Sequence, residues 1–281
     1  MRSLASVVVA IAVAAGAAVG VAAQSVPVPE IQASLGGRTL ADAQRLFYNA
    51  RYEEAATLTL ALRSLDADDL GAYELRTSAL HFQVKRALGD AGDRDKALKQ
   101  CAACPALMEA FLSDTTRGRS LARERLKATP LDEEALFFLG KINLNYVWLQ
   151  LGTLGRRTGW DEYWEARRSL DAVLKRNPIH VRARVARAWI DYIVDTKMPW
   201  GTGWLLGGGN KKKALAALRE AADADADEFV RAEADFALWD LHVRERQITE
   251  AVPVARGLAR DFPDNPEIAR FLDTHDPDRP R

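Results

Sequence analysis

The 281-residue chain contains few of the residues on which metal sites and catalytic triads depend. It has only two cysteines, and its four histidines are scattered along the sequence. A structural zinc site needs about four clustered Cys or His ligands, and no such cluster is visible. We therefore predict no metal, no cofactor and no catalytic residues, and we expect a protein that is not an enzyme.

An excess of charge is also missing. Lys plus Arg and Asp plus Glu each number 39, so the formal net charge is zero. A general nucleic-acid binder neutralises phosphates with surplus Lys and Arg, so the composition argues against that class. Because 48% of the residues are hydrophobic, the chain can still bury a large core and is not a disordered protein.

Only one apolar run approaches the length of a membrane span. Leu4–Val19 follows the positive charge of Arg2, and small residues at 21–23 offer a cleavage site. This pattern is typical of a secretory signal peptide, so we predict a signal peptide at 1–23 and a loose, extended lead-in at 24–38. The alternative is an uncleaved membrane anchor. No cysteine lies near the cleavage point, so we expect a periplasmic or secreted protein rather than a lipoprotein.

The two cysteines, Cys101 and Cys104, form a C-x-x-C pair. An oxidising compartment favours a disulfide between them. A redox-active pair is the alternative, but no βαβ pattern surrounds the motif. A c-type haem site would need His after the second cysteine, where this chain has Pro105. We predict a local disulfide.

The most informative pattern is a repeated interval. The segment Tyr52-Glu-Glu-Ala55 returns as Tyr163-Trp-Glu-Ala166 and Ile248-Thr-Glu-Ala251. Twelve positions after each final alanine stands a residue suited to stop a helix: Ala67, Pro178 and Pro263. Two further small residues, Gly118 and Ala214, precede Pro130 and Ala226 by the same interval.

This interval resembles the tetratricopeptide repeat (TPR), in which a small residue opens the second helix of each helical hairpin and a proline typically follows that helix. The resemblance covers roughly residues 40–272, although no single copy carries the full pattern. It implies an all-α superhelical solenoid of about five TPR-like hairpins. A weaker similarity, in the stretch LGGGNKKKAL, is to the helical-repeat component of tripartite periplasmic uptake systems.

Apolar side chains at helical period support these hairpins independently. Tyr163, Ala166, Leu170 and Val173 form one stripe, with charged residues such as Arg167 on the other face. We predict one helical domain over 39–273 and a flexible tail over 274–281. The expected helix pairs are 39–50 with 52–65, 68–88 with 106–128, 132–151 with 160–176, 179–196 with 211–223, and 227–244 with 247–261, followed by a helix near 265–273. Four aspartates lie near helix starts and are expected to act as caps: Asp68, Asp132, Asp227 and Asp264.

The repeats are unevenly spaced. The five small marker residues are separated by 63, 48, 48 and 37 positions, whereas the usual repeat is about 34 residues. The surplus must lie in long first helices or in the turns inside the hairpins, at 89–105, 152–159 and 197–210. Corresponding turns of a solenoid stack along one edge. We therefore expect these three segments to form one edge, called the insert rim below.

The stretch GWLLGGGNKKKA at 203–214 belongs to this rim. It is not a phosphate-binding Walker loop, because no Ser or Thr follows the lysines. Three lysines in a first helical turn oppose the helix dipole, so a bound anion would be favourable there. The alternative is a plain inter-helix turn. The predicted rim site for an anionic ligand comprises Arg156, Arg157, Trp200, Trp204, Lys211, Lys212 and Lys213.

Two functional hypotheses follow. The first is an exported, non-enzymatic scaffold that binds a peptide or protein partner in its concave groove, as the TPR resemblance implies. The second is a periplasmic carrier of a small anionic ligand held at the insert rim. For the first hypothesis we assign six polar residues of first helices to the groove: Asn143, Asn145, Arg184, Arg187, Asp191 and Asp195.

Overall fold

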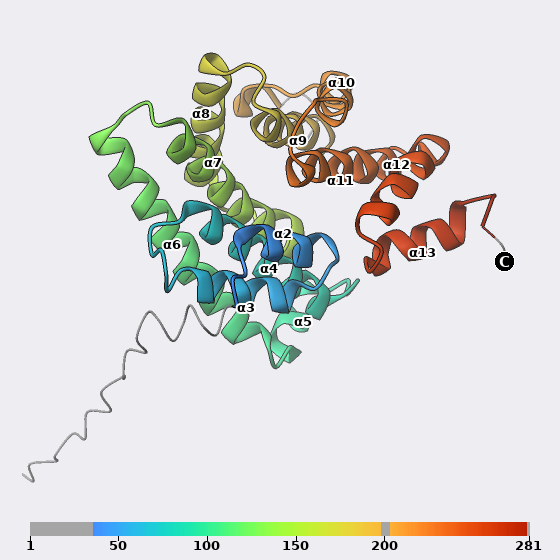
Figure 1. The fold of residues 1–281 in the computed structure, drawn as a ribbon, viewed down its shortest axis with the longest axis horizontal. Coiled ribbons are helices and arrows are strands. Elements are labelled where there is room, and N and C mark those ends of the chain that lie inside the picture. The colour runs from blue at the N-terminus through green and yellow to red at the C-terminus, as the bar shows by residue number, and fades with distance from the viewer. Residues whose placement is uncertain (1–35, 198–202, 280–281) are drawn as a thin grey trace, which may run out of the picture.

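The computed structural model describes residues 36–197 and 203–279, without the side chains of residues 197, 204 and 205. Within this part of the chain the structure consists of twelve α-helices and contains no strand (Figure 1). The helices are α2 (Leu40–Tyr48), α3 (Tyr52–Leu62), α4 (Leu70–Leu88), α5 (Arg94–Gln100), α6 (Cys104–Ala128), α7 (Glu133–Val147), α8 (Trp160–Arg176), α9 (Val181–Lys197), α10 (Lys211–Ala222), α11 (Glu228–Arg244), α12 (Ile248–Asp261) and α13 (Pro266–His275). A π-helical turn, η1 (Trp148–Thr153), and a 3₁₀ turn, η2 (Gly203–Leu206), complete the regular structure. None of the helices described combines the length and apolar character that a membrane span requires.

The predicted stack of helical hairpins is confirmed. The five expected pairs are α2 with α3, α4 with α6, α7 with α8, α9 with α10, and α11 with α12, and α13 packs on α12. The second helix of one hairpin also packs on the first helix of the next, as α6 does on α7 and α10 on α11. Contact between successive hairpins is the packing order of a solenoid.

Glycines let the helices approach closely at two points of the stack. A Cβ at Gly118 of α6 would lie 2.8 Å from Cδ1 of Ile142 and 3.0 Å from Cβ of Tyr73. A Cβ at Gly140 of α7 would lie 2.8 Å from Cγ of Leu170. Any side chain there would push a neighbouring helix outward, because a packed interior has little space to give.

Helix capping agrees with the sequence in part. Asp132 caps α7 and Asp227 caps α11, each accepting a hydrogen bond from a first-turn amide. At α4 and α13, however, Asp69 and Asn265 are the caps, one residue beyond the predicted Asp68 and Asp264. The cap must directly precede the first helical residue to reach those amides, so a one-residue error in a helix start selects the wrong side chain.

Two segments differ from the prediction. The first insert contains a short helix, α5, which the sequence analysis placed in a turn. The tail was expected to be flexible from residue 274, yet Arg256 of α12 forms ion pairs with Asp276 and Asp278. Arg279 also donates a hydrogen bond of 2.9 Å to the carbonyl oxygen of Ala269. The tail is therefore bonded to α12 and α13 as far as it is described.

Candidate functional site

The side of the stack lined by first helices is filled by the chain's own charged residues. Glu74, Lys141, Arg182 and Glu233 come from α4, α7, α9 and α11 and form one network, called the central network below. Arg182 donates to Oε2 of Glu74 at 3.1 Å and to Oε2 of Glu233 at 2.5 Å. Lys141 Nζ lies 2.5 Å from Oε1 of Glu233. Four hairpins are thus joined across the region in which a groove was expected.

The central network is largely removed from solvent. The side chains of Glu74 and Glu233 are only 6% and 13% exposed. Burial alone would raise the pKa of Glu233, but the charges of Arg182 and Lys141 and their hydrogen bonds outweigh it and lower the pKa to about 2. The guanidinium of Arg182 also lies over the ring of Phe137, 4.8 Å from its centroid. Two anions and two cations therefore form a neutral contact inside the stack.

Two of the six residues assigned to the groove are buried. Asn143 has no exposed surface and donates to Oε2 of Glu165 on α8 at 2.7 Å. Asn145 is 6% exposed and donates to Thr77 Oγ1 and Ser78 Oγ on α4, at 2.9 Å each. The prediction that these asparagines face a partner is wrong. Buried amides need hydrogen-bond partners, and here neighbouring helices accept from the amide nitrogens of both side chains.

The other four predicted groove residues join α9 to its neighbours α8 and α10. Arg187 bonds to Asp171 of α8 at 2.7 Å and to Asp191 at 2.6 Å. Arg184 forms an ion pair with Glu220 of α10. Asp195 accepts from the amide of Lys211 at 2.9 Å. These polar groups already have partners, and their role in binding another protein stays a prediction.

The three inserts lie next to one another, as the insert-rim prediction requires. Arg156 of the second insert donates to Asp95 of the first at 3.3 Å. Leu154 of the second insert belongs to the same buried cluster as Leu98 of the first. The second and third inserts share a pocket lined by Gly159 and Leu206. As far as the structure describes them, the inserts of consecutive hairpins are therefore neighbours.

Arg167 and Tyr163 of α8 hold the glycine-rich part of the third insert. Arg167 donates to the carbonyl oxygens of Leu206 and Gly207 at 2.9 and 2.7 Å, and Tyr163 Oη donates to that of Leu206 at 2.8 Å. Gly207 has a φ of +80°, which favours glycine. Its missing Cβ would lie 2.7 Å from Cζ of Arg167. The sequence analysis placed Arg167 on the face opposite the apolar stripe. Its acceptor at Leu206 lies 39 positions further along the chain, and no local pattern connects the two.

The start of α10 does not need an external anion. Asn210 accepts from the amide of Lys213, and Asp195 accepts from that of Lys211, both at 2.9 Å. The Asp195 carboxylate also meets the positive end of the helix dipole, and Lys211 Nζ lies 2.7 Å from Glu245. The chain's own oxygens thus occupy the positions that an anion would take. The stretch is an ordered inter-helix turn, and the structure gives the anion hypothesis no support.

The remaining described cations of the predicted rim site lie at the surface. Arg157, Lys212 and Lys213 are exposed, and the side chain of Arg156 is 44% exposed beside Asp95. Trp200 lies outside the described residues, as does the side chain of Trp204. The binding of an anionic ligand by these residues stays a prediction.

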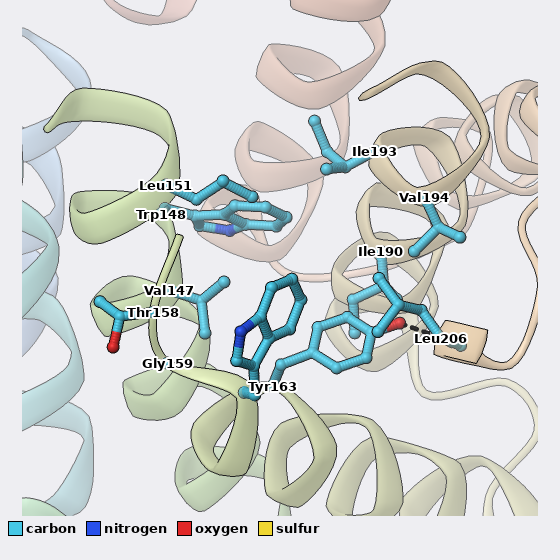
Figure 2. Close-up of a pocket in the computed structure, with 11 residues that line it drawn as sticks. Val147, Trp148, Leu151, Thr158, Gly159, Tyr163, Ile190, Ile193, Val194 and Leu206 are labelled. Carbon is cyan, nitrogen blue, oxygen red and sulfur yellow. Dashed lines mark hydrogen bonds between the residues drawn. The ribbon is translucent and has the colours of Figure 1, made fainter. Parts of the chain in front are cut away.

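The insert rim contains an apolar pocket that the sequence did not reveal as a unit. Figure 2 shows Trp148, Leu151 and Tyr163 around it, with Ile190 and Val194 on the α9 side. The lining comprises Val147, Trp148, Leu151, Thr158, Gly159, Trp160, Tyr163, Ile190, Ile193, Val194 and Leu206. Trp160 remains 43% exposed. The enclosed volume is about 20 Å³, whereas pockets for drug-sized ligands usually measure about 300–1,000 Å³.

Comparison with known proteins concerns the fold alone. No family model and no curated protein matches the chain. Among solved structures, the stack is similar to a thermophilic TPR protein from Thermus thermophilus, with a TM-score of 0.45 and 16% sequence identity. The similarity covers 83% of this chain and 95% of that one. The fold itself, as far as the chain is described, is an all-α stack of helical hairpins.

The cysteines lie at the outer end of the second TPR-like hairpin, where α5 meets α6. Their Sγ atoms are 2.07 Å apart, and Cys104 has no exposed surface. Cys104 and Cys101 pack with Leu98 and Phe111 in the cluster that also holds Leu154. A bond between the two sulfur atoms would close a short loop within the first insert, between the end of α5 and the start of α6.

We predict that a disulfide between Cys101 and Cys104 stabilises the oxidised protein. Closing a loop this short lowers the entropy of the unfolded chain by an amount worth about 2 kcal/mol. Urea unfolding with and without a reductant should show that difference, and a C101S/C104S variant should be insensitive to the reductant. Two free thiols in the denatured, unreduced protein would contradict the prediction.

Proposed function

We propose that the protein is an exported protein-interaction scaffold whose partner docks on the insert rim. The observation that carries the proposal is the aromatic pocket between the second and third inserts, with Trp160 partly exposed beside it. The apolar run at residues 4–19 supports export. In the closed stack, the central network disfavours docking in the groove, because its charged side chains already fill that region.

The size of the pocket favours a protein partner over a small ligand. A volume of about 20 Å³ holds little more than one water molecule and cannot enclose an organic anion. It can, however, receive the tip of an apolar side chain once Trp160 and Trp148 adjust their rotamers. Tryptophan and tyrosine around such a pocket are the residue types that dominate binding energy in protein interfaces.

The charges beside the pocket indicate the chemistry of the partner. Arg157 is exposed and Arg156 is 44% exposed in the turn that precedes Trp160. Both belong to the insert that lines the pocket through Thr158 and Gly159. Complementary charge accelerates association and selects partners. The proposed partner therefore presents an apolar side chain flanked by carboxylates.

Photo-cross-linking in the native envelope tests this docking site. A p-benzoylphenylalanine in place of Trp160 should give one dominant adduct. The same group in place of Leu60, which is 46% exposed on α3, should not give that adduct. Once the partner is identified, Trp160→Ala should weaken binding roughly 30-fold or more, as expected for an aromatic anchor, while Leu60→Ala should leave the affinity within about 2-fold.

Equal cross-linking from positions 160 and 60 would contradict docking on the rim. Loss of affinity in both variants would point instead to a general effect on the fold. The small-ligand alternative would gain support if organic acids raised the melting temperature of the wild type but not of a K212A/K213A variant.

A further inference from the structure

The two ends of the described stack meet, and this contact is called the closure below. Tyr48 and Asn49, at the end of α2, face the turn between α12 and α13. Asn265 donates to the carbonyl oxygen of Tyr48 at 2.7 Å, and the amide of Asp264 donates to Oδ1 of Asn49 at 3.0 Å. Arg45 donates to both carboxylate oxygens of Glu228 at 2.9 and 2.7 Å. The solenoid is thereby joined across more than 180 positions of sequence.

We infer that the closure is a releasable contact that controls access to the concave face. This inference concerns the first-helix side of the stack and is independent of docking on the insert rim. It depends on two physical features. Few residues hold the closure, and the charges of the central network oppose its opening only weakly.

One aromatic ring supplies most of the apolar contact in the closure. The Tyr48 ring is stacked with Phe236 at 5.4 Å and with Phe229 at 6.2 Å, and lies 5.2 Å from Phe262. Its hydroxyl donates to the carbonyl oxygen of Phe229 at 3.3 Å. Adjacent hairpins, by contrast, pack along whole helix faces such as that of α6 on α7. Of the contacts between hairpins, the closure is therefore the one that opens most readily.

The polar contacts of the closure resist opening only weakly. Arg45 and Glu228 are 50% and 38% exposed, and an ion pair so close to water contributes little to stability. The hydrogen bonds of Asn49 and Asn265 are replaced by bonds to water when the turns separate, so their net contribution is also small.

The central network does not hold the closure shut either. Opening separates Arg182 from Glu74 of α4, but it also returns these buried charges to water. For a buried ion pair, the regained hydration largely offsets the lost attraction. The open form is thus a minor state, in which the faces of α4, α7, α9 and α11 that hold the network become accessible.

Hydrogen exchange and small-angle X-ray scattering on the full chain test the inference. Tyr48→Ala should raise the open population roughly 100-fold or more, as expected for loss of a packed aromatic ring. Amides of α2, of residues 228–236 and of α13 should then exchange faster by about that factor, and the radius of gyration should rise. Leu170→Ala removes a fully buried side chain from a cluster of α7, α8 and α9 that contains no residue of the closure, and should speed exchange in α7 and α8 without expansion.

A charge swap separates opening from loss of folding. Arg45→Glu should speed exchange at the same closure segments by about 3- to 10-fold, because attraction becomes repulsion. The double variant R45E/E228R should return the rates to within about 2-fold of wild type. Faster exchange spread evenly over all helices in Tyr48→Ala, unchanged exchange and scattering in that variant, or no rescue by the double variant would each overturn the inference.

Discussion

An Arg182→Ala variant is expected to unfold with a free energy about 3–5 kcal/mol below that of the wild type. The substitution leaves the carboxylates of Glu74 and Glu233 buried and without their shared guanidinium. A buried charge that loses its partner is far less favourable than the same charge in water. Urea denaturation gives this difference directly, and the melting temperature should fall by roughly 10 °C.

Arg184→Ala is the matched control on the same helix. Arg184 pairs with Glu220, whose side chain is 68% exposed, so its loss should lower stability by about 1 kcal/mol or less. Equal destabilisation by the two substitutions would show that the central network has no special role. Arg182→Lys should fall between wild type and alanine, because lysine keeps the charge but not the planar fork.

Acid provides a second measurement of the same network. The pKa of Glu233 is held at about 2 in the folded protein, below its ordinary value of 4.5. The stability from this carboxylate is therefore fully present above about pH 4.5 and is lost as the pH falls towards 2. The stability of Arg182→Ala should decline less over that range, because only Lys141 then remains to lower this pKa.

Gly209→Ala is expected to lower the free energy of unfolding by about 2–3 kcal/mol. A Cβ at this position would overlap the carbonyl oxygen of Asp191 and lie 2.7 Å from the amide nitrogen of Asp195. Both atoms belong to the backbone of α9, which cannot rotate aside as a side chain can. The third insert would have to lift from α9 and carry Leu206 away from the rim pocket.

Gly152→Ala separates this steric effect from a general preference for glycine. No atom lies within 4 Å of a Cβ at Gly152, so the substitution should be neutral or slightly stabilising. Near-ultraviolet circular dichroism should change in Gly209→Ala, because Tyr163 loses its acceptor at Leu206, and should be unchanged in Gly152→Ala. Comparable stability of both variants would contradict the close packing of Gly209 on α9.

The helices could be predicted from sequence because their signals are local. The interval from Ala166 to Pro178 places the end of one helix by itself, and the structure ends α8 at Arg176. The insert rim was predictable for the same reason, since the constant interval after each small marker residue leaves the surplus residues before the marker. The short helix α5 was missed because seven residues carry too little periodic pattern to distinguish a helix from a turn.

The groove residues could not be chosen in the same way. Asn145 is a polar residue of a first helix and was therefore assigned to the groove. Its partners Thr77 and Ser78, however, lie on a helix about 70 positions earlier. Whether such an amide meets water, a partner or another helix depends on how closely the first helices converge. The ion pair between Arg182 and Glu74 spans 108 positions, and no local pattern connects them.

The sequence by itself thus determined where helices begin and end, how they pair, and that the inserts share an edge. Periodicity, prolines and small residues act within a few turns of helix, so short windows contain that information. Only the tertiary structure decided that Tyr48 meets Phe229, that charges fill the concave side, and that an aromatic pocket forms on the rim. Those features depend on the small rotation between successive hairpins, which accumulates over the stack and is set by all of its packing contacts together.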